Sequence, residues 1–179
     1  MSKAVFLDRD GTINEEVEYL NDHNKFRFMP GSIKALEMLQ KNGYRIILVT
    51  NQSGIAKGKI SKEQLKKIHD EMKSHLSIVN GIPISDEEIY HCPHNASDKC
   101  DCRKPNVKNF KEAEKKYKID PSKSYVIGDK TSDIEAGRRG GYKTILVQTG
   151  YAGKDGKYEV KPDFVAKDLL HAAKIITGG

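Results

Sequence analysis

Residues 3–12 read KAVFLDRDGT, and this stretch decides the fold because a short apolar run ends abruptly in two carboxylates. Apolar runs without alternation are typical of strands that are buried on both faces of a parallel sheet. Residues 44–50 (YRIILVT) form a second such run. Between the two runs, residues 30–32 (PGS) start an amphipathic segment and residues 42–43 (NG) end it. The order strand, helix, strand predicts a parallel pair joined by a right-handed crossover.

The same alternation continues toward the C-terminus. We expect a helix that begins at Ser61 in a capping box, a strand over 88–91, a helix from Asn106 to about Tyr117, a strand over 124–128, a helix over 132–139 and a strand over 143–147. Residues 151–161 are expected to form a mobile loop. The predicted fold class is α/β: a single domain over residues 1–179, built as a Rossmann-like three-layer sandwich with a mostly parallel sheet. Ligands of such sheets bind at the carboxyl ends of the strands.

Composition excludes several classes of protein. A chain of 179 residues can bury roughly 70% of its unfolded surface and needs no obligate partner to fold. No apolar run reaches the roughly 18 residues of a membrane span, and only four apolar residues precede Asp8, too few for a secretory signal. We therefore expect a cytoplasmic protein that does not contact a membrane.

The net charge of +6 invites a nucleic-acid partner, but the lysines are scattered and form no basic block. Aromatic residues make up 7% of the chain and include no tryptophan, which leaves little material for stacking bases. The charge is compatible with an anionic small molecule instead, and nucleic acid is not the expected partner.

Three of the predicted strands end in residues that can carry chemistry. The first ends at Asp8 and Asp10, the second at Thr50, and a later one at Asp129. Carboxylates that meet at one sheet edge repel one another unless a divalent cation lies among them, and Mg²⁺ prefers such oxygen ligands. With Thr50 and Lys104 added, the site could hold a phosphoryl group that a carboxylate attacks. Each of these short motifs alone is a common loop sequence. Together, however, all of them fall at the predicted carboxyl edge of the sheet, in an order that can form one site.

These residues resemble a known family. Residues 8–12 (DRDGT), Thr50, Lys104 and residues 129–133 look like the four motifs of the haloacid dehalogenase superfamily of phosphatases, in order, over residues 4 to 150. Within that superfamily, three stretches are similar to the D-glycero-D-manno-heptose 1,7-bisphosphate 7-phosphatases and the related histidinol-phosphate phosphatase domain. They are residues 8–14 (DRDGTIN), residues 50–55 (TNQSGI) and residues 92–105 (CPHNASDKCDCRKP).

The resemblance implies an activity and a role for each matching residue. The implied activity is Mg²⁺-dependent hydrolysis of the C7 phosphate of heptose 1,7-bisphosphate, on the route to nucleotide-activated heptose. Asp8 would be the nucleophile that becomes an aspartyl-phosphate, and Asp10 the general acid and base. Mg²⁺ would be held by the Asp8 carboxylate, the Asp10 backbone carbonyl and Asp129, while Thr50 and Lys104 grip the phosphoryl group. The implied substrate-binding residues are Glu16, Tyr19, Asn51, Gln52, Ser53, Arg103 and Lys130. Asp133 is expected to orient Lys104 or the waters of the metal rather than to bind the metal directly.

All three cysteines lie in residues 92–102, called the zinc loop here. Cys92, His94, Cys100 and Cys102 supply four ligands for a tetrahedral Zn²⁺ with no open position, which is typical of a structural site. One alternative is three reduced thiols beside a surface histidine. Another is a redox pair, although the dithiol spacing here has one intervening residue where redox motifs have two. His91 is a further candidate ligand, but as the expected last residue of a strand it is more often a packing residue. A disulfide framework is not expected from an odd number of clustered cysteines.

Neither segment 14–46 nor segment 81–104 has room for a helical cap domain, so the site should be open. Selectivity would then depend on loops, and Arg103 suits a second, non-reacting phosphate because a guanidinium binds bidentately. The spacer between His94 and Cys100 is shorter than in commoner members. Histidinol phosphate is the runner-up substrate, and a polynucleotide 3′-phosphatase or a non-enzymatic zinc-ribbon module are the alternatives from further afield. We expect a monomer whose partner is a small sugar phosphate.

Overall fold

A computed structural model describes residues 1–179, apart from the side chains of residues 78 and 79. Its centre is a six-stranded parallel sheet in the order β3-β2-β1-β4-β5-β6. The strands are β1 (Lys3–Leu7), β2 (Tyr44–Asn51), β3 (Ile89–Cys92), β4 (Tyr125–Gly128), β5 (Lys143–Val147) and β6 (Phe164–Ala166). The α-helices are α1 (Ser32–Lys41), α2 (Lys62–Ser74), α3 (Lys108–Tyr117), α4 (Thr131–Gly140) and α5 (Leu169–Thr177). Short helical turns lie at His23–Lys25, His75–Val79, Asp86–Glu88, Ala96–Asp98 and Pro121–Lys123.

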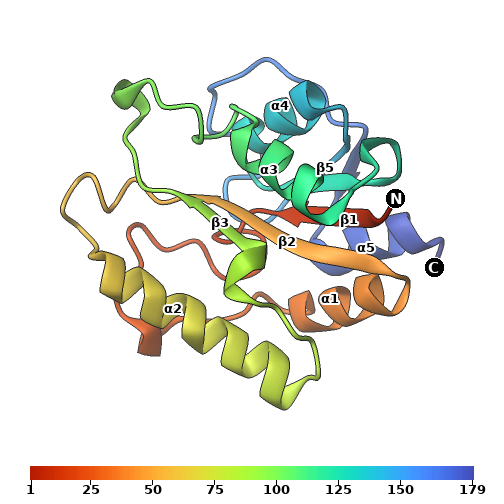
Figure 1. The fold of residues 1–179 in the computed structure, drawn as a ribbon, viewed down its shortest axis with the longest axis horizontal. Helices are drawn as coiled ribbons and strands as arrows, with labels where there is room; N and C mark the ends of the chain where they lie inside the picture. Colours follow the sequence, from red (N-terminus) through yellow and green to blue (C-terminus); the bar gives the residue numbers. More distant parts are fainter.

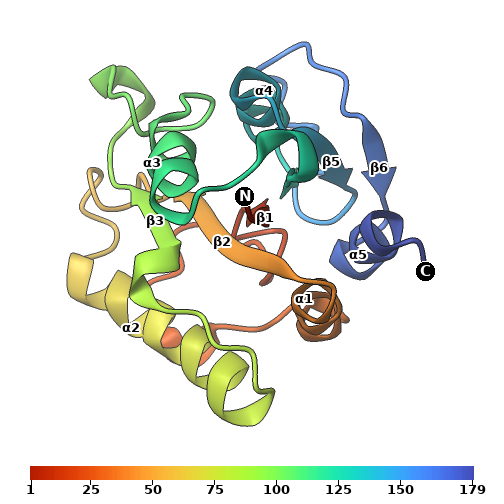
Figure 2. The ribbon, with the colours of Figure 1, turned by 45° about the vertical axis from the view of Figure 1, so that its right-hand side comes forward.

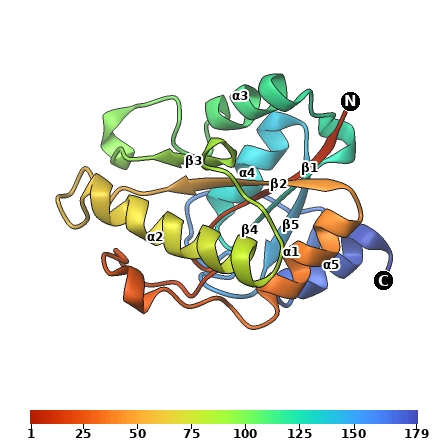
Figure 3. The same ribbon diagram turned by 60° about the horizontal axis from the view of Figure 1, so that its bottom comes forward.

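Helices cover both faces of this sheet, which confirms the predicted three-layer α/β class. Figures 1 and 3 show α3 and α4 on one face and α1, α2 and α5 on the other. The alternation of β1 explains the two layers, because Val5 and Leu7 join the apolar cluster that includes α1, α2 and α5. Ala4 and Phe6 point the other way and join the cluster that includes Phe110 of α3. A strand with apolar side chains on both faces is thereby fully buried.

The order of the strands fixes where a ligand can bind. From β1 the chain builds β2 and β3 on one side, and then crosses over to build β4, β5 and β6 on the other side. Figure 2 shows the two halves diverging from β1, with β6 and α5 at one edge. The carboxyl ends of β1 and β4 therefore flank a crevice at the point where the order reverses. Asp8 directly follows β1, where its N–H donates to the Ile127 carbonyl at 3.0 Å, and Asp129 directly follows β4.

The structure differs from the sequence expectations in a few elements. Asn106 does not cap α3, because its side chain donates to the Cys100 carbonyl at 2.7 Å and the helix begins at Lys108. The third strand is shifted by one residue and ends at Cys92, so His91 is not its last residue. β6 and α5 were not expected from the sequence. Over the described residues, no helix is long and apolar enough to cross a membrane.

Candidate functional site

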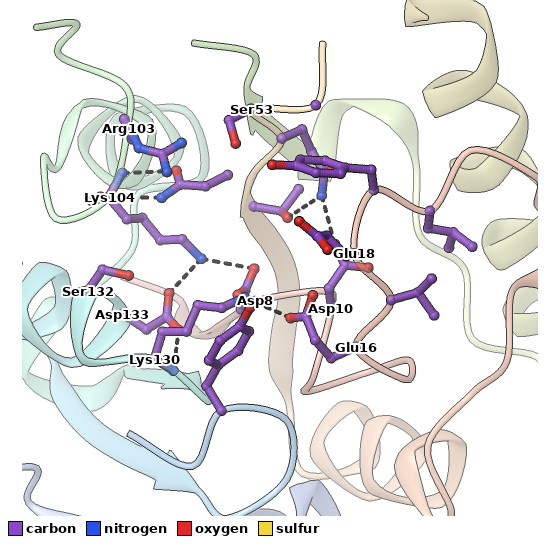
Figure 4. Close-up of a pocket in the computed structure, with 18 of the residues that line it drawn as sticks. Asp8, Asp10, Glu16, Glu18, Ser53, Arg103, Lys104, Lys130, Ser132 and Asp133 are labelled. Carbon is purple, nitrogen blue, oxygen red and sulfur yellow. Dashed lines mark hydrogen bonds and ion pairs between the residues drawn. The ribbon is translucent and has the colours of Figure 1, made fainter. Parts of the chain in front are cut away.

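A pocket of about 260 Å³ opens above the carboxyl ends of β1 and β2 and the loop that follows β4 (Figure 4). It is lined by all the residues that the sequence assigned to catalysis or substrate binding: Asp8, Asp10, Glu16, Tyr19, Thr50, Asn51, Gln52, Ser53, Arg103, Lys104 and Lys130. These residues come from positions 8 to 130 of the chain, and the parallel topology brings them to one edge. Lys57, Tyr151 and Lys157 also line the pocket and were not predicted.

Asp8 lies at the bottom of the pocket and is held on one oxygen. Its Oδ1 is 3.0 Å from the Lys104 ammonium and accepts the Arg9 N–H at 2.8 Å. Burial alone would raise the pKa of Asp8, but the Lys104 and Lys130 charges outweigh burial and hold the pKa below its usual value. The carboxylate is therefore ionised, as a nucleophile must be.

Lys104 is a buried cation whose three donors are all engaged. Its Nζ is 3.0 Å from Asp8 Oδ1 and 2.7 Å from Asp133 Oδ1, and it donates to the Val49 carbonyl at 2.6 Å. In Figure 4 the ammonium points toward both carboxylates from one side of the pocket. Burial opposes the charge, yet Asp133 and Asp8 raise the pKa of Lys104 above its ordinary value. The expectation that Asp133 orients Lys104 agrees with this geometry.

Asp10 lies on the side of Asp8 that is opposite to Lys104, and a different set of donors forms hydrogen bonds to its carboxylate. The Arg9 guanidinium contacts both its oxygens, Oδ1 at 2.9 Å and Oδ2 at 2.8 Å from Nη2, with Nε 3.1 Å from Oδ1. Asn14 donates to Oδ1 at 2.9 Å, and Gln52 donates to Oδ2 at 2.9 Å. Sequence reasoning missed Arg9 and Asn14. The available signal was their position inside the DRDGTIN stretch.

The residues after β2 mostly hold other site residues in place. Thr50 is buried, and its hydroxyl oxygen accepts from Gln52 Nε2 at 2.9 Å. Asn51 accepts the Lys104 N–H at 3.0 Å and donates to the Lys104 carbonyl at 3.3 Å. Both polar ends of the Asn51 side chain are thus used to clamp the Lys104 backbone, and Gln52 is used to fix Asp10 and Thr50.

Asp129 is fully buried, but only one of its two carboxylate oxygens accepts a hydrogen bond. Its Oδ2 accepts the Tyr151 N–H at 2.8 Å, while its Oδ1 has no hydrogen-bond partner among the described residues. A Cβ on Gly11 would lie only 2.4 Å from Asp129 Oδ2, so this approach requires glycine. Burial, together with the Asp8 charge, raises the pKa of Asp129 to about 8.

These features fit a divalent cation. Carboxylate oxygens of Asp8, Asp129 and Asp133 lie within 4.8 Å of one another, and the Lys104 ammonium contacts only Asp8 and Asp133, so Asp129 has no hydrogen-bonded counter-charge among the described residues. Asp129 Oδ1 supplies a buried oxygen that accepts no hydrogen bond among the described residues, with Lys130 Nζ 4.0 Å from it. Oxygen ligands of this kind suit Mg²⁺. Because Asp133 is engaged by Lys104 and by the Lys130 N–H at 3.0 Å, Asp8 and Asp129 are the freer ligands.

The mouth of the pocket carries a mixture of charges. Lys130 pairs with Glu16 at 2.8 Å, and Tyr19 accepts from Lys57 Nζ at 2.6 Å. Arg103 donates from Nη1 to the His94 carbonyl at 3.1 Å, which attaches it to the zinc loop. Over the described residues, the rim cations Lys57, Arg103 and Lys157 form no ion pair with a carboxylate. The mouth of the pocket therefore carries unpaired positive charge, whereas carboxylates lie at its bottom.

The four predicted zinc ligands converge beside this rim. Sγ of Cys92 is 3.6 Å from Cys100 Sγ and 3.1 Å from Cys102 Sγ, and the last two sulfurs are 3.7 Å apart. His94 Nδ1 is 3.5 Å from Cys92 Sγ and 3.3 Å from Cys102 Sγ. A tetrahedron with Zn–S bonds of about 2.3 Å has S···S edges of about 3.8 Å. The donor set and its spacing therefore fit a closed Zn²⁺ site, and all three cysteines are free of disulfides.

Comparison with known proteins agrees with this site. A family model described as HAD-hydrolase-like matches residues 101–172. The chain is 43% identical, over 94% of both chains, to the D-glycero-beta-D-manno-heptose-1,7-bisphosphate 7-phosphatase of Haemophilus ducreyi. It is 40% identical, over 99% of this chain and 98% of the relative, to the enzyme of the same name from Pasteurella multocida.

A solved structure is similar over nearly the whole chain. It is the D,D-heptose 1,7-bisphosphate phosphatase of B. bronchiseptica complexed with magnesium and phosphate, with a TM-score of 0.85, 30% identity and 98% coverage of both chains. The two relatives that match at 40–43% identity over 94% or more of both chains bear the name of one phosphatase. The chain therefore belongs to the D-glycero-D-manno-heptose-1,7-bisphosphate 7-phosphatase family of haloacid dehalogenase-like hydrolases.

Proposed function

We propose that the chain hydrolyses the C7 phosphate of D-glycero-β-D-manno-heptose 1,7-bisphosphate through an aspartyl-phosphate on Asp8. The observation that carries this proposal is the ionised Asp8, held by Lys104 at the bottom of a pocket whose rim is cationic. Its support is the full-length similarity to relatives that carry the name of this activity.

In the first step, a carboxylate oxygen of Asp8 forms a bond to phosphorus while the bond between phosphorus and O7 of the sugar breaks. Asp10 gives its proton to O7, so that the sugar leaves as an alcohol. The Thr50 hydroxyl would donate to the phosphoryl oxygens, whose charge increases in the transition state, and Lys104, whose donors hold Asp8, Asp133 and the Val49 carbonyl, would supply positive charge beside them. Asp8 needs no base, because its low pKa keeps it ionised.

In the second step, Asp10 accepts a proton from water, and the water oxygen attacks phosphorus. The bond between phosphorus and Asp8 breaks, which releases inorganic phosphate and regenerates both carboxyl groups. The roles of Asp8 and Asp10 differ because their partners differ: Lys104 lies against the first, and Arg9, Asn14 and Gln52 surround the second. Two carboxyl groups with unlike surroundings can divide acid and base work between them.

Asp8 and Asp129, with the Asp10 backbone carbonyl, would hold Mg²⁺, which would neutralise charge between the nucleophile and the phosphoryl oxygens. Cys92, His94, Cys100 and Cys102 would hold a structural Zn²⁺ that fixes the zinc loop, and with it Arg103 and Lys104. Neither group of ligands belongs to the other site.

The second phosphate of the substrate would bind at the rim. Arg103 is placed there by its hydrogen bond to the His94 carbonyl, and it lines the same pocket as Lys57 and Lys157. A guanidinium binds phosphate oxygens in pairs, which favours Arg103 for the phosphate on C1. Glu16 and Tyr19, on the loop after β1, would contact sugar hydroxyls.

The test is a phosphate-release screen with Mg²⁺ over the α and β anomers of heptose 1,7-bisphosphate, histidinol phosphate and 3′-phosphorylated DNA. We expect the highest kcat/KM for the β-anomer bisphosphate, with release from C7. Preferred turnover of histidinol phosphate or of the DNA would contradict the proposal. That the chain acts as a cytoplasmic monomer stays a prediction, which light scattering and cell fractionation would test.

A further inference from the structure

A buried histidine on α2 contacts the site from outside the predicted machinery. His69 is 6% exposed, and its Nε2 lies 3.1 Å from Nη1 of Arg9. A guanidinium has only donors, so Nε2 must accept and the imidazole proton must be on Nδ1. Burial, with the Arg9 charge beside it, lowers the pKa of His69 to about 2, so the ring stays neutral. His69 is therefore a permanent hydrogen-bond acceptor for Arg9.

Among the described side chains, Arg9 is the largest that is fully buried, at 1% exposure. A charged group at such depth is costly unless its donors are satisfied. Nε and Nη2 are used by the Asp10 carboxylate, and Nη1 is used by His69. The guanidinium plane is thus fixed at both ends, by a carboxylate on one side and by an α2 side chain on the other. Rotation of the guanidinium group would break its hydrogen bonds to Asp10 and to His69 at the same time.

The orientation of Asp10 depends on this arrangement. Its side chain is 15% exposed, and the bidentate Arg9 contact defines the plane of the carboxyl group. A general acid must lie within hydrogen-bond reach of the leaving oxygen in the right direction, and small displacements cost rate heavily. We propose that Arg9 and His69 are positioning residues that hold Asp10 in line with the leaving oxygen. This proposal rests on the proposed acid role of Asp10.

The proposal predicts an effect that depends on the leaving group. kcat/KM reports only the steps up to departure of the leaving group, in which Asp10 acts as an acid. A sugar alkoxide needs that proton, whereas 4-nitrophenolate is a stable anion that leaves without one. His69→Leu should therefore lower kcat/KM by about 10-fold or more for the heptose bisphosphate, and by less than about 3-fold for 4-nitrophenyl phosphate.

Three further variants separate positioning from a merely structural role. His69→Gln keeps an acceptor at the place of Nε2 and should restore kcat/KM to within about 3-fold of the original. Arg9→Lys keeps the charge but loses the bidentate contact, so it should show the same leaving-group selectivity as His69→Leu. Met72→Ala removes a buried apolar side chain from the same helix, and it should lower the melting temperature without any selectivity.

Equal losses of His69→Leu on the two substrates would overturn the proposal, and so would a Gln variant as slow as the Leu variant. If the unmodified enzyme ignores heptose bisphosphate, the proposed substrate is wrong, and the comparison is made with another alkyl phosphate that the enzyme hydrolyses. The failure of the substrate assignment and the failure of the positioning role are thereby distinguished.

Discussion

Replacing Asp129 by Asn should stabilise the magnesium-free protein while it removes activity. Asp129 is fully buried, and its Oδ1 has no hydrogen-bond partner among the described residues. An amide oxygen can still accept the Tyr151 N–H that Asp129 Oδ2 accepts at 2.8 Å. An uncharged amide would remove the cost of burying this charge and its repulsion from Asp8 and Asp133, which together outweigh the attraction of Lys130. A residue that serves metal binding is thus expected to cost stability when the metal is absent.

The size of the effect follows from the pKa of Asp129, which rises from 3.8 to about 8. Each pKa unit corresponds to about 1.4 kcal/mol, so the ceiling is about 6 kcal/mol. Because relaxation and water entry lower such penalties, we expect about 2–4 kcal/mol, or roughly 5–15 °C in melting temperature. Between pH 4 and pH 8 the unfolded chain loses this proton first. The original protein should therefore become less stable relative to Asp129→Asn as the pH rises, and the difference should level off above pH 8.

Thermal unfolding in magnesium-free buffer, with zinc left in place, measures this directly at pH 4.5, 6 and 8. Mg²⁺ should raise the melting temperature of the original protein by mass action and leave that of Asp129→Asn nearly unchanged. Asp70→Asn is the matched control, because that carboxylate is partly exposed at the surface and its ion pairs with Lys66 and Lys73 contribute little. If Asp129→Asn is less stable than the original protein at pH 8 without Mg²⁺, the reasoning about the buried charge is wrong.

Three other variants address the remaining parts of the site. Asp8→Asn should abolish phosphate release at saturating Mg²⁺, because an amide cannot act as the nucleophile; near-normal release would rule out the covalent route. Cys100→Ser should lower the melting temperature, the bound zinc measured by metal analysis and the rate, and an unchanged protein would contradict the structural-zinc hypothesis. Arg103→Ala should lower kcat/KM for heptose 1,7-bisphosphate by an amount that corresponds to about 2–3 kcal/mol of transition-state stabilisation, and it should barely change kcat/KM for a monophosphate. Equal losses on the two substrates would show that Arg103 does not bind the second phosphate.

Strands that are buried on both faces were predictable from the sequence to within one residue. The expected ranges 3–7 and 143–147 coincide with β1 and β5, because apolar runs leave few alternatives for a strand boundary. β6 was not predicted, since it has three residues and lies at the sheet edge with Phe164 and Val165 exposed. The helix after it carried a signal that was overlooked, namely Asp168, whose side chain caps the helix by accepting the His171 N–H.

The site was predictable where chemistry follows strand ends, and not where it depends on packing. Asp8 and Lys104 were expected to meet because their motifs lie at the carboxyl edge of one sheet. The contact between Arg9 and His69 joins residues 60 positions apart. This contact depends on which face of α2 packs against the sheet. The helical periodicity predicts only that His69 is buried beside Ile68 and Met72, and it does not predict the partner of His69. A buried hydrogen bond of this kind becomes visible only when the helix has been placed.

The zinc loop and the lysine of the site are one structural unit, although no zinc ligand lies in the pocket. Cys92 pairs in register with Asn51 at the end of β2, and the Asn51 side chain clamps the backbone of Lys104. Within the loop, the sulfurs of Cys92 and Cys102 lie 3.1 Å apart, so a shared metal would join the start of the loop to the residue two before Lys104. Both ends of the segment are thereby tied to the same residue of β2. Loss of the metal would remove the tie between Cys92 and Cys102, two residues before Lys104, while the Asn51 clamp would remain, and this explains how a structural metal can influence a reaction that it does not touch.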